Sequence, residues 1–258
     1  MTIRTDTPNL LDDPPSDRNE GEQKMRSPQN TAITPARSWP VRSRLVGIAA
    51  IAFAVSVTIE NAVLAGTGAP TFGAPIEEVL AYYAAHRDSV AIASSQVALN
   101  LPLLLVFVTG LHGLVQRRGE AGADWSRLAV AAGASLSAIF VLVNVLQIGL
   151  ALSADGLAEP TPAFELVWHV HAAAFALALP TLGTTFIGAA LAAHASGLTP
   201  PWQRLLSLVG GSLLLAAGLG SLAIADGSEL IFVGLLGFAA WLVWLLTTGA
   251  RLVRPGPR

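Results

Sequence analysis

Carboxylate, amide and imidazole side chains lie inside apolar stretches of this chain, where burying a polar group in lipid is costly and suggests a function. The segment AFELVWHVHAAAFALALP, residues 163–180, carries Glu165, His169 and His171 near its start. A carboxylate beside an imidazole can bind a ligand, relay a proton or contribute to a metal site. On a helix, Glu165 and His169 lie about 40° apart, whereas the two histidines lie about 160° apart. The spacing therefore pairs His169 with Glu165 and predicts that the histidines do not chelate one ion together.

The two helical faces that carry these histidines differ in the size of their residues. The face of His169 continues mainly through alanine and glycine, which is typical of close helix packing in membranes. The face of His171 carries mostly bulky apolar residues, which suit lipid or a looser contact. We therefore expect Glu165 and His169 to point into a helix bundle, and His171 to lie at the membrane interface.

Further polar side chains occur at a similar depth in three other apolar stretches: Glu60, Gln96, Asn100, Asn144 and Gln147. Gln96 and Asn100 are four residues apart and Asn144 and Gln147 three apart, so each pair shares one stripe of a helix. Because an amide in hydrocarbon needs a hydrogen-bonding partner, we expect these groups to cluster inside the bundle. Together with Glu165 and His169, they are the candidate ligand or proton site.

The composition places these groups in a membrane protein. Of the 258 residues, 53% are hydrophobic and 12% are charged, whereas about 25% of residues are charged in a soluble domain. The chain has no cysteine, which excludes disulfides, thiolate metal sites and cysteine nucleophiles. Segments of membrane-spanning length, about 20 residues, occur at 45–65, 89–114, 128–152, 165–193, 204–225 and 229–252. The predicted fold is an all-α bundle of six transmembrane helices.

The basic residues predict the orientation of this bundle. Of the 15 lysines and arginines, only Arg87 falls in the loops on the side opposite the termini. The positive-inside rule then places both termini in the cytoplasm, and the polar cluster opens to the outside. Residues 1–41 are predicted to be a disordered cytoplasmic tail, 42–253 the transmembrane domain, and 254–258 a short cytoplasmic tail.

A short amphipathic helix is predicted in the loop after the first span. Pro75 suits the first helical position, and Ile76, Val79, Leu80 and Tyr83 recur at helical spacing. We expect this helix on the outer ends of the spans. The tryptophans of the last span, Trp241 and Trp244, are interpreted as interfacial anchors or lipid-facing bulk.

Metal and enzyme chemistry are the weaker alternatives. A metal site needs three or four ligands, which would have to converge from Glu60, Glu165 and His169 with His86 or Asp226. No nucleophile with a base and an orienting group is evident. We therefore predict no metal, no cofactor and no catalytic residue. The predicted partners are the lipid bilayer and a small ligand or a proton, with no nucleic acid, and the oligomeric state stays unknown.

The second half of the chain resembles a known family. The segment HVHAAAFALALPTLGTTFIGAALAAHASGLTPPWQRLLSLVGG contains a turn of the form S-G-x-x-P-x-W at residues 196–202, and RLVG at 44–47 opens the first span. Over about residues 43–250 the chain resembles a family of small six-span bacterial membrane proteins of unknown function. This resemblance implies six helices in a bacterial cytoplasmic membrane and assigns no catalytic residue.

Two functions are compatible with these observations. The leading hypothesis is small-ligand or proton-linked binding or transport at the polar cluster, in which Glu60 and His169 are the titrating groups. The alternative is a non-catalytic scaffold or sensor that acts through contacts with partner proteins.

Overall fold

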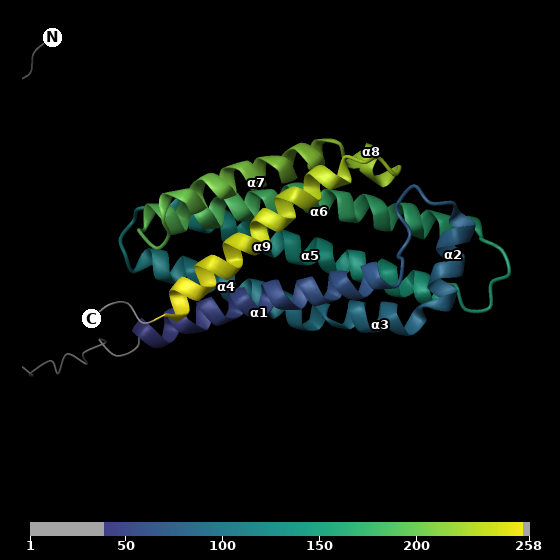
Figure 1. Cartoon of the computed structure of the whole chain (residues 1–258), viewed down its shortest axis with the longest axis horizontal. Coiled ribbons are helices and arrows are strands. Elements are labelled where there is room, and N and C mark those ends of the chain that lie inside the picture. The colour runs from purple at the N-terminus through teal and green to yellow at the C-terminus, as the bar shows by residue number, and fades with distance from the viewer. Residues whose placement is uncertain (1–38, 255–258) are drawn as a thin grey trace, which may run out of the picture. The chain divides into compact units, whose positions relative to one another are not determined.

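The computed structural model describes residues 39–254; residues 1–38 and 255–258, which include most of both predicted tails, lie outside the described residues. Every regular element in the described range is a helix (Figure 1). The helices are α1 Trp39–Gly66, α2 Ile76–Ala85, α3 Arg87–Ser95, α4 Val97–Gln116, α5 Ala123–Ser153, α6 Pro162–Ala195, α7 Pro201–Leu219, α8 Ser221–Ala225 and α9 Ile231–Val253.

Six of the described helical stretches are long and apolar enough to cross a membrane, which confirms that part of the predicted fold. They are Val41–Gly66, Arg87–Gln116, Ala123–Ser153, Pro162–Ala195, Pro201–Leu219 and Leu230–Val253. The fifth is shorter than predicted, because α7 ends at Leu219 and α8 follows as a separate helix after Gly220. A Cβ atom on Gly220 would lie 2.7 Å from Leu230 Cδ1, so this break lets the chain turn tightly toward α9.

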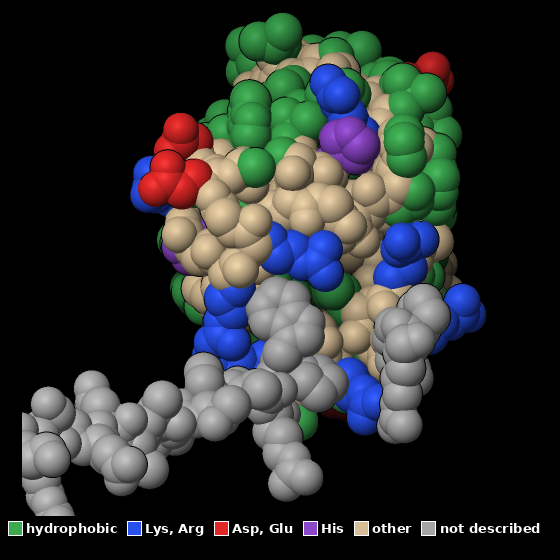
Figure 2. Space-filling model, turned by 90° about the vertical axis from the view of Figure 1, so that its left-hand side faces the viewer, with side chains coloured by type: hydrophobic (Ala, Val, Ile, Leu, Met, Phe, Trp, Pro, Cys, Tyr) green, Lys and Arg blue, Asp and Glu red, His purple; other side chains and the backbone are tan. Residues whose placement is uncertain are grey.

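The bundle has two ends with different chemistry. One carries α2, and we call it the α2 end; the other carries the start of α1 and the end of α9, and we call it the termini end (Figure 1). Figure 2 looks onto the termini end and shows basic side chains spread around it. The arginines on the helix ends and loops here are Arg42, Arg44, Arg117, Arg118, Arg127, Arg204, Arg251 and Arg254.

Helix α6 is the central helix of the bundle. In its most apolar window 61% of the residues are buried, against 28–33% in the other five spans. Its many alanines explain this position, because small side chains let neighbouring helices approach on several sides. Residues on α6 are therefore best placed to contact anything held inside the bundle.

Helix α9 changes its packing partner along its length. A Cβ atom on Gly47 would lie 2.6 Å from the carbonyl oxygen of Gly249, so α1 and α9 touch through their backbones near the termini end. Nearer the α2 end, a Cβ atom on Gly237 would lie 2.6 Å from the carbonyl oxygen of Gly210, so the close partner there is α7. Figure 1 shows α9, in yellow, crossing from the α7 side to the α1 side. As a consequence, α1 and α9 diverge toward the α2 end.

Helix α2 and the loop before it cover this end of the bundle. A helix begins directly after Pro75, as the sequence predicted, and buries Val79, Leu80, Tyr82 and Tyr83. These side chains belong to one apolar cluster with residues of α5 and α6, among them Leu150, Phe164 and Trp168. In the preceding loop, a Cβ atom on Gly73 would lie 3.0 Å from the Cα atom of Gly227, so the loop contacts the α8–α9 turn backbone to backbone.

Candidate functional site

A cavity of about 240 Å³ lies where α1 and α9 diverge, and residues of α1, α4, α5, α6 and α9 line it. The loop before α2 contributes Phe72, and α2 contributes Tyr82 and Tyr83. The cavity reaches the surface between α1 and α9, because Asn61 and Leu235 both line it and are both exposed. Four of the seven predicted site residues are among its lining: Glu60, Asn100, Asn144 and Gln147.

The polar stripes of α1 and α4 meet at this cavity. Asn100 Nδ2 donates a hydrogen bond of 2.6 Å to Glu60 Oε2, and Ser56 Oγ donates one of 3.3 Å to Gln96 Oε1. The second bond lies beside the cavity, since neither Ser56 nor Gln96 lines it. Gln96, at the junction of α3 and α4, is thus placed as a link to α1, whereas Glu60 and Asn100 line the cavity.

Four buried polar atoms around the cavity have no hydrogen-bonding partner within the described part of the chain. They are Asn100 Oδ1, Asn144 Oδ1, His171 Nδ1 and Trp241 Nε1, and their residues are between 0% and 7% exposed. Leaving one such atom unpaired costs about 1–3 kcal/mol, and native proteins contain few of them. Four such atoms belong to residues that line this one cavity, so the number of unpaired polar groups here is high for a protein interior.

Aromatic side chains close the cavity toward the α2 end. We call Phe72, Tyr82, Tyr83, Trp168 and His171 the cap cluster. Trp168 and His171 stack with ring centroids 5.5 Å apart, and the Phe72 ring centroid lies 5.6 Å from that of Trp168. Burial, with a smaller contribution from Tyr82, raises the pKa of the Tyr83 phenol above its ordinary value. Tyr83 therefore presents a protonated hydroxyl group to the cavity at neutral pH.

A second aromatic group closes the cavity toward the termini end. We call Phe107, Phe186, Trp241 and Trp244 the floor cluster. The two indoles stack with ring centroids 5.4 Å apart, and Phe186 lies edge-on to Trp241 at 5.1 Å. Both tryptophans are 0% exposed, so the interpretation of Trp241 and Trp244 as interfacial or lipid-facing is wrong. In a membrane protein a bulky apolar side chain can face lipid or fill the core, so residue size alone does not predict where Trp241 and Trp244 lie.

The predicted orientation of the histidines is also wrong, and the structure has the reverse. Glu165 and His169 are exposed and do not line this cavity, whereas His171 is 7% exposed and lines it. His171 belongs to a stripe with Phe164, Trp168 and Phe175, at helical spacing. These bulky residues face inward because α2 and the loop carrying Phe72 cover them, and Phe164 and Trp168 also pack against the end of α5. Further along α6 a small residue does mark close helix packing, because Gly183 contacts α7 there.

Sequence reasoning thus missed His171, Trp168, Phe72 and Trp241. For His171 and Trp168 a signal was present in the sequence: they form an aromatic and imidazole stripe at the start of a membrane span, beside a glycine- and proline-rich loop. Nothing in the local sequence marks Phe72 or Trp241 as lining residues, because tertiary packing brings them to the cavity.

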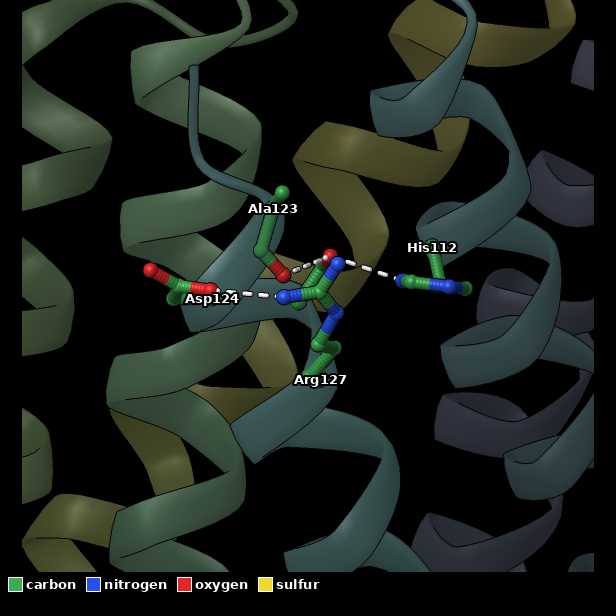
Figure 3. A network of polar contacts seen from close by, with 5 residues as sticks. His112, Ala123, Asp124 and Arg127 are labelled. Atoms are coloured by element: carbon green, nitrogen blue, oxygen red, sulfur yellow. Dashed lines mark hydrogen bonds and ion pairs between the residues drawn. The ribbon is translucent and has the colours of Figure 1, made fainter. Parts of the chain in front are cut away.

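Among residues 39–254, no three or more histidine, aspartate or glutamate side chains come close enough to hold a metal ion. A separate polar network lies at the termini end (Figure 3). The Ser126 hydroxyl donates to the Ala123 carbonyl at 2.7 Å, so the 2.8 Å contact with His112 is one in which the Nδ1–H group donates to Ser126. This bond joins α4 to the first turn of α5, which is a structural role.

Comparison of the chain with protein-family models, with curated proteins and with solved structures finds no match. The family resemblance noted from the sequence therefore stays a prediction, and the function has to be argued from the cavity itself.

Proposed function

We propose that this membrane protein binds a small amphipathic organic molecule in the cavity between α1 and α9. The observation that carries the proposal is a cavity lined mainly by apolar side chains, around which four buried polar atoms have no partner within the described part of the chain. An apolar cavity of about 150 Å³ accepts a benzene molecule, so 240 Å³ leaves room for a ring with a short polar arm.

The α2 end is proposed to face the outside of the cell. Supporting this orientation, the arginines surround the opposite end (Figure 2), as expected for a cytoplasmic face. The ligand is proposed to enter from the outer half of the bilayer, past the exposed lining residues Asn61 and Leu235. An amphipathic molecule concentrates in that part of a membrane before it binds.

Binding is favoured over proton-linked transport for two reasons. The floor cluster lies directly on the termini side of the cavity, and its fully buried tryptophans separate the cavity from that end of the bundle. The proton-linked hypothesis also rested on Glu60 together with His169, and the exposed position of His169 removes that pair.

The test is equilibrium binding of two probes, 2-phenylethanol and 2-phenylethylammonium, to the full chain in lipid nanodiscs at neutral pH. At least one probe is expected to bind saturably to the wild-type protein. Ala178→Phe should abolish this binding, because Ala178 is 3% exposed and lines the cavity, so the added ring fills it.

The matched control is Ala173→Phe. This residue lies on the same helix, but it is exposed and does not line the cavity, so binding should be unchanged. The proposal is overturned if neither probe binds the wild-type protein, or if the two variants bind equally well.

A further inference from the structure

Two of the four unpaired atoms around the cavity are amide oxygens, which accept hydrogen bonds, and one, Trp241 Nε1, is a donor. Asn100 uses its Nδ2 group to donate to Glu60, and Asn144 uses its own to donate to the Phe140 carbonyl at 2.9 Å. In both amides the atom left without a partner is therefore the oxygen, which can only accept. An occupant that satisfies these two oxygens has to bring N–H or O–H donors.

Glu60 adds an acceptor with the capacity for negative charge. Its single hydrogen bond within the described part of the chain occupies Oε2, which leaves Oε1 without a protein donor. No lysine or arginine lines the cavity. A positive charge placed here would therefore be the first cationic partner of the Glu60 carboxylate, in surroundings where charge pairs interact more strongly than in water.

The cavity walls suit an organic cation better than a hydrated ion. Ring faces attract cations at about 6 Å or less from the ring centroid, and the lining includes Phe53, Tyr83, Phe140, Trp168 and Trp241. A metal ion would find only one carboxylate, and an anionic head group would be repelled by it. A quaternary ammonium group has no N–H donor, so the amide oxygens would stay unpaired.

We propose that the ligand is a primary ammonium ion on an aromatic or branched aliphatic body. Its N–H groups donate to Glu60, Asn100 and Asn144, and its apolar body lies against the cap cluster. The inference rests on the proposed function and names the chemical class of molecule that the same cavity accepts.

Three probes of matched shape test the class in the full chain in nanodiscs at pH 7: 2-phenylethylammonium, 2-phenylethanol and trimethyl(2-phenylethyl)ammonium. Hydrogen bonds to a charged group are about twice as strong as neutral ones. The primary ammonium probe is therefore expected to bind at least about tenfold more tightly than the alcohol and than the quaternary probe.

Glu60→Gln removes the charge while it keeps the shape of the side chain. In this variant the primary ammonium probe should lose its advantage over the alcohol. Glu165→Gln is the matched control, because Glu165 is exposed and away from the cavity, and it should bind all three probes as the wild type does.

Asn144→Asp provides a second variant that does not depend on losing Glu60. It places a further carboxylate at the cavity and should strengthen binding of the primary ammonium probe several-fold without strengthening binding of the alcohol. The ammonium class is overturned if the alcohol binds the wild-type protein as tightly as the ammonium probe, or if Glu60→Gln retains the preference. In both cases the proposed function stands, whereas it fails as well if none of the three probes binds.

Discussion

The two halves of the bundle hold their helices together in different ways. Around the floor cluster, helices touch through glycine backbones and fully buried side chains, and the buried Gln203 donates a 2.7 Å hydrogen bond to Thr247. Toward the α2 end, aromatic rings separate α1, α6 and α9, and buried amide oxygens have no partner. The first region is closely packed, although it has unpaired polar atoms too, among them Trp244 Nε1, whereas the second encloses a cavity.

The largest expected contrast comes from adding one aromatic ring to α6 in each half. Ala189 is 0% exposed and lines no cavity, whereas Ala178 lines the cavity. Ala189→Phe should lower the free energy of unfolding by about 3 kcal/mol through overpacking, and Ala178→Phe should leave it nearly unchanged. Denaturant unfolding in detergent micelles, followed by circular dichroism, measures both. Equal losses would show that the two halves are packed alike.

A smaller contrast is expected from a single methyl group at the α1–α9 contact. A Cβ atom on Gly249 would lie 2.7 Å from the carbonyl oxygen of Gly47, so Gly249→Ala should cost about 2 kcal/mol. Gly149→Ala is the control, because a Cβ atom there meets nothing within 4 Å. The same unfolding measurement distinguishes them, and a stable Gly249→Ala protein would mean that this crossing is looser than described.

Removing one buried side-chain amide should change the stability of the protein in opposite directions in the two halves. Gln203→Leu leaves Thr248 without its contact to the Gln203 carbonyl and should destabilise the protein by about 1 kcal/mol. Asn144→Leu removes an unpaired oxygen and should raise stability by a similar amount, while binding of 2-phenylethylammonium weakens. Unfolding and binding are measured on the same preparations, and a destabilised Asn144→Leu protein would contradict the idea that this oxygen is a cost.

The smallest expected effect on the free energy of unfolding occurs only at alkaline pH. The raised pKa of Tyr83 means that its phenol is protonated in both folded and unfolded states below about pH 10. Above that pH the unfolded chain loses the proton first, so the free energy of unfolding should fall as pH rises. Since the chain has only two tyrosines, phenolate absorbance in the wild type and in Tyr83→Phe isolates this group. Ionisation of Tyr83 at its ordinary pH in the folded protein would show that the cap cluster is open to water.

The architecture was predictable because long apolar segments and their breaks are local properties of the sequence. The six spans and α2 follow from such signals, and so does the shared stripe of Gln96 and Asn100. The inward face of α6 was not predictable from the same signals. Whether bulky residues such as Trp168 face lipid or a cavity depends on which part of α6 is covered by α2 and its loop. The sequence pattern of α6 alone contains no information on this tertiary contact.

The backbone contact between Gly73 and Gly227 bears on how fast a ligand exchanges. Phe72, next to Gly73, lines both the cavity and a neighbouring groove that extends along the α8–α9 turn. Any molecule that passes on this side has to displace the Phe72 ring. The loop that carries this ring contacts the α8–α9 turn through the backbones of Gly73 and Gly227. For a ligand that exchanges on this side of the proposed site, the loop would control residence time, and Glu60 with its neighbouring amides would control affinity. Substitutions at Gly73 should then alter the rates of entry and exit far more than their ratio.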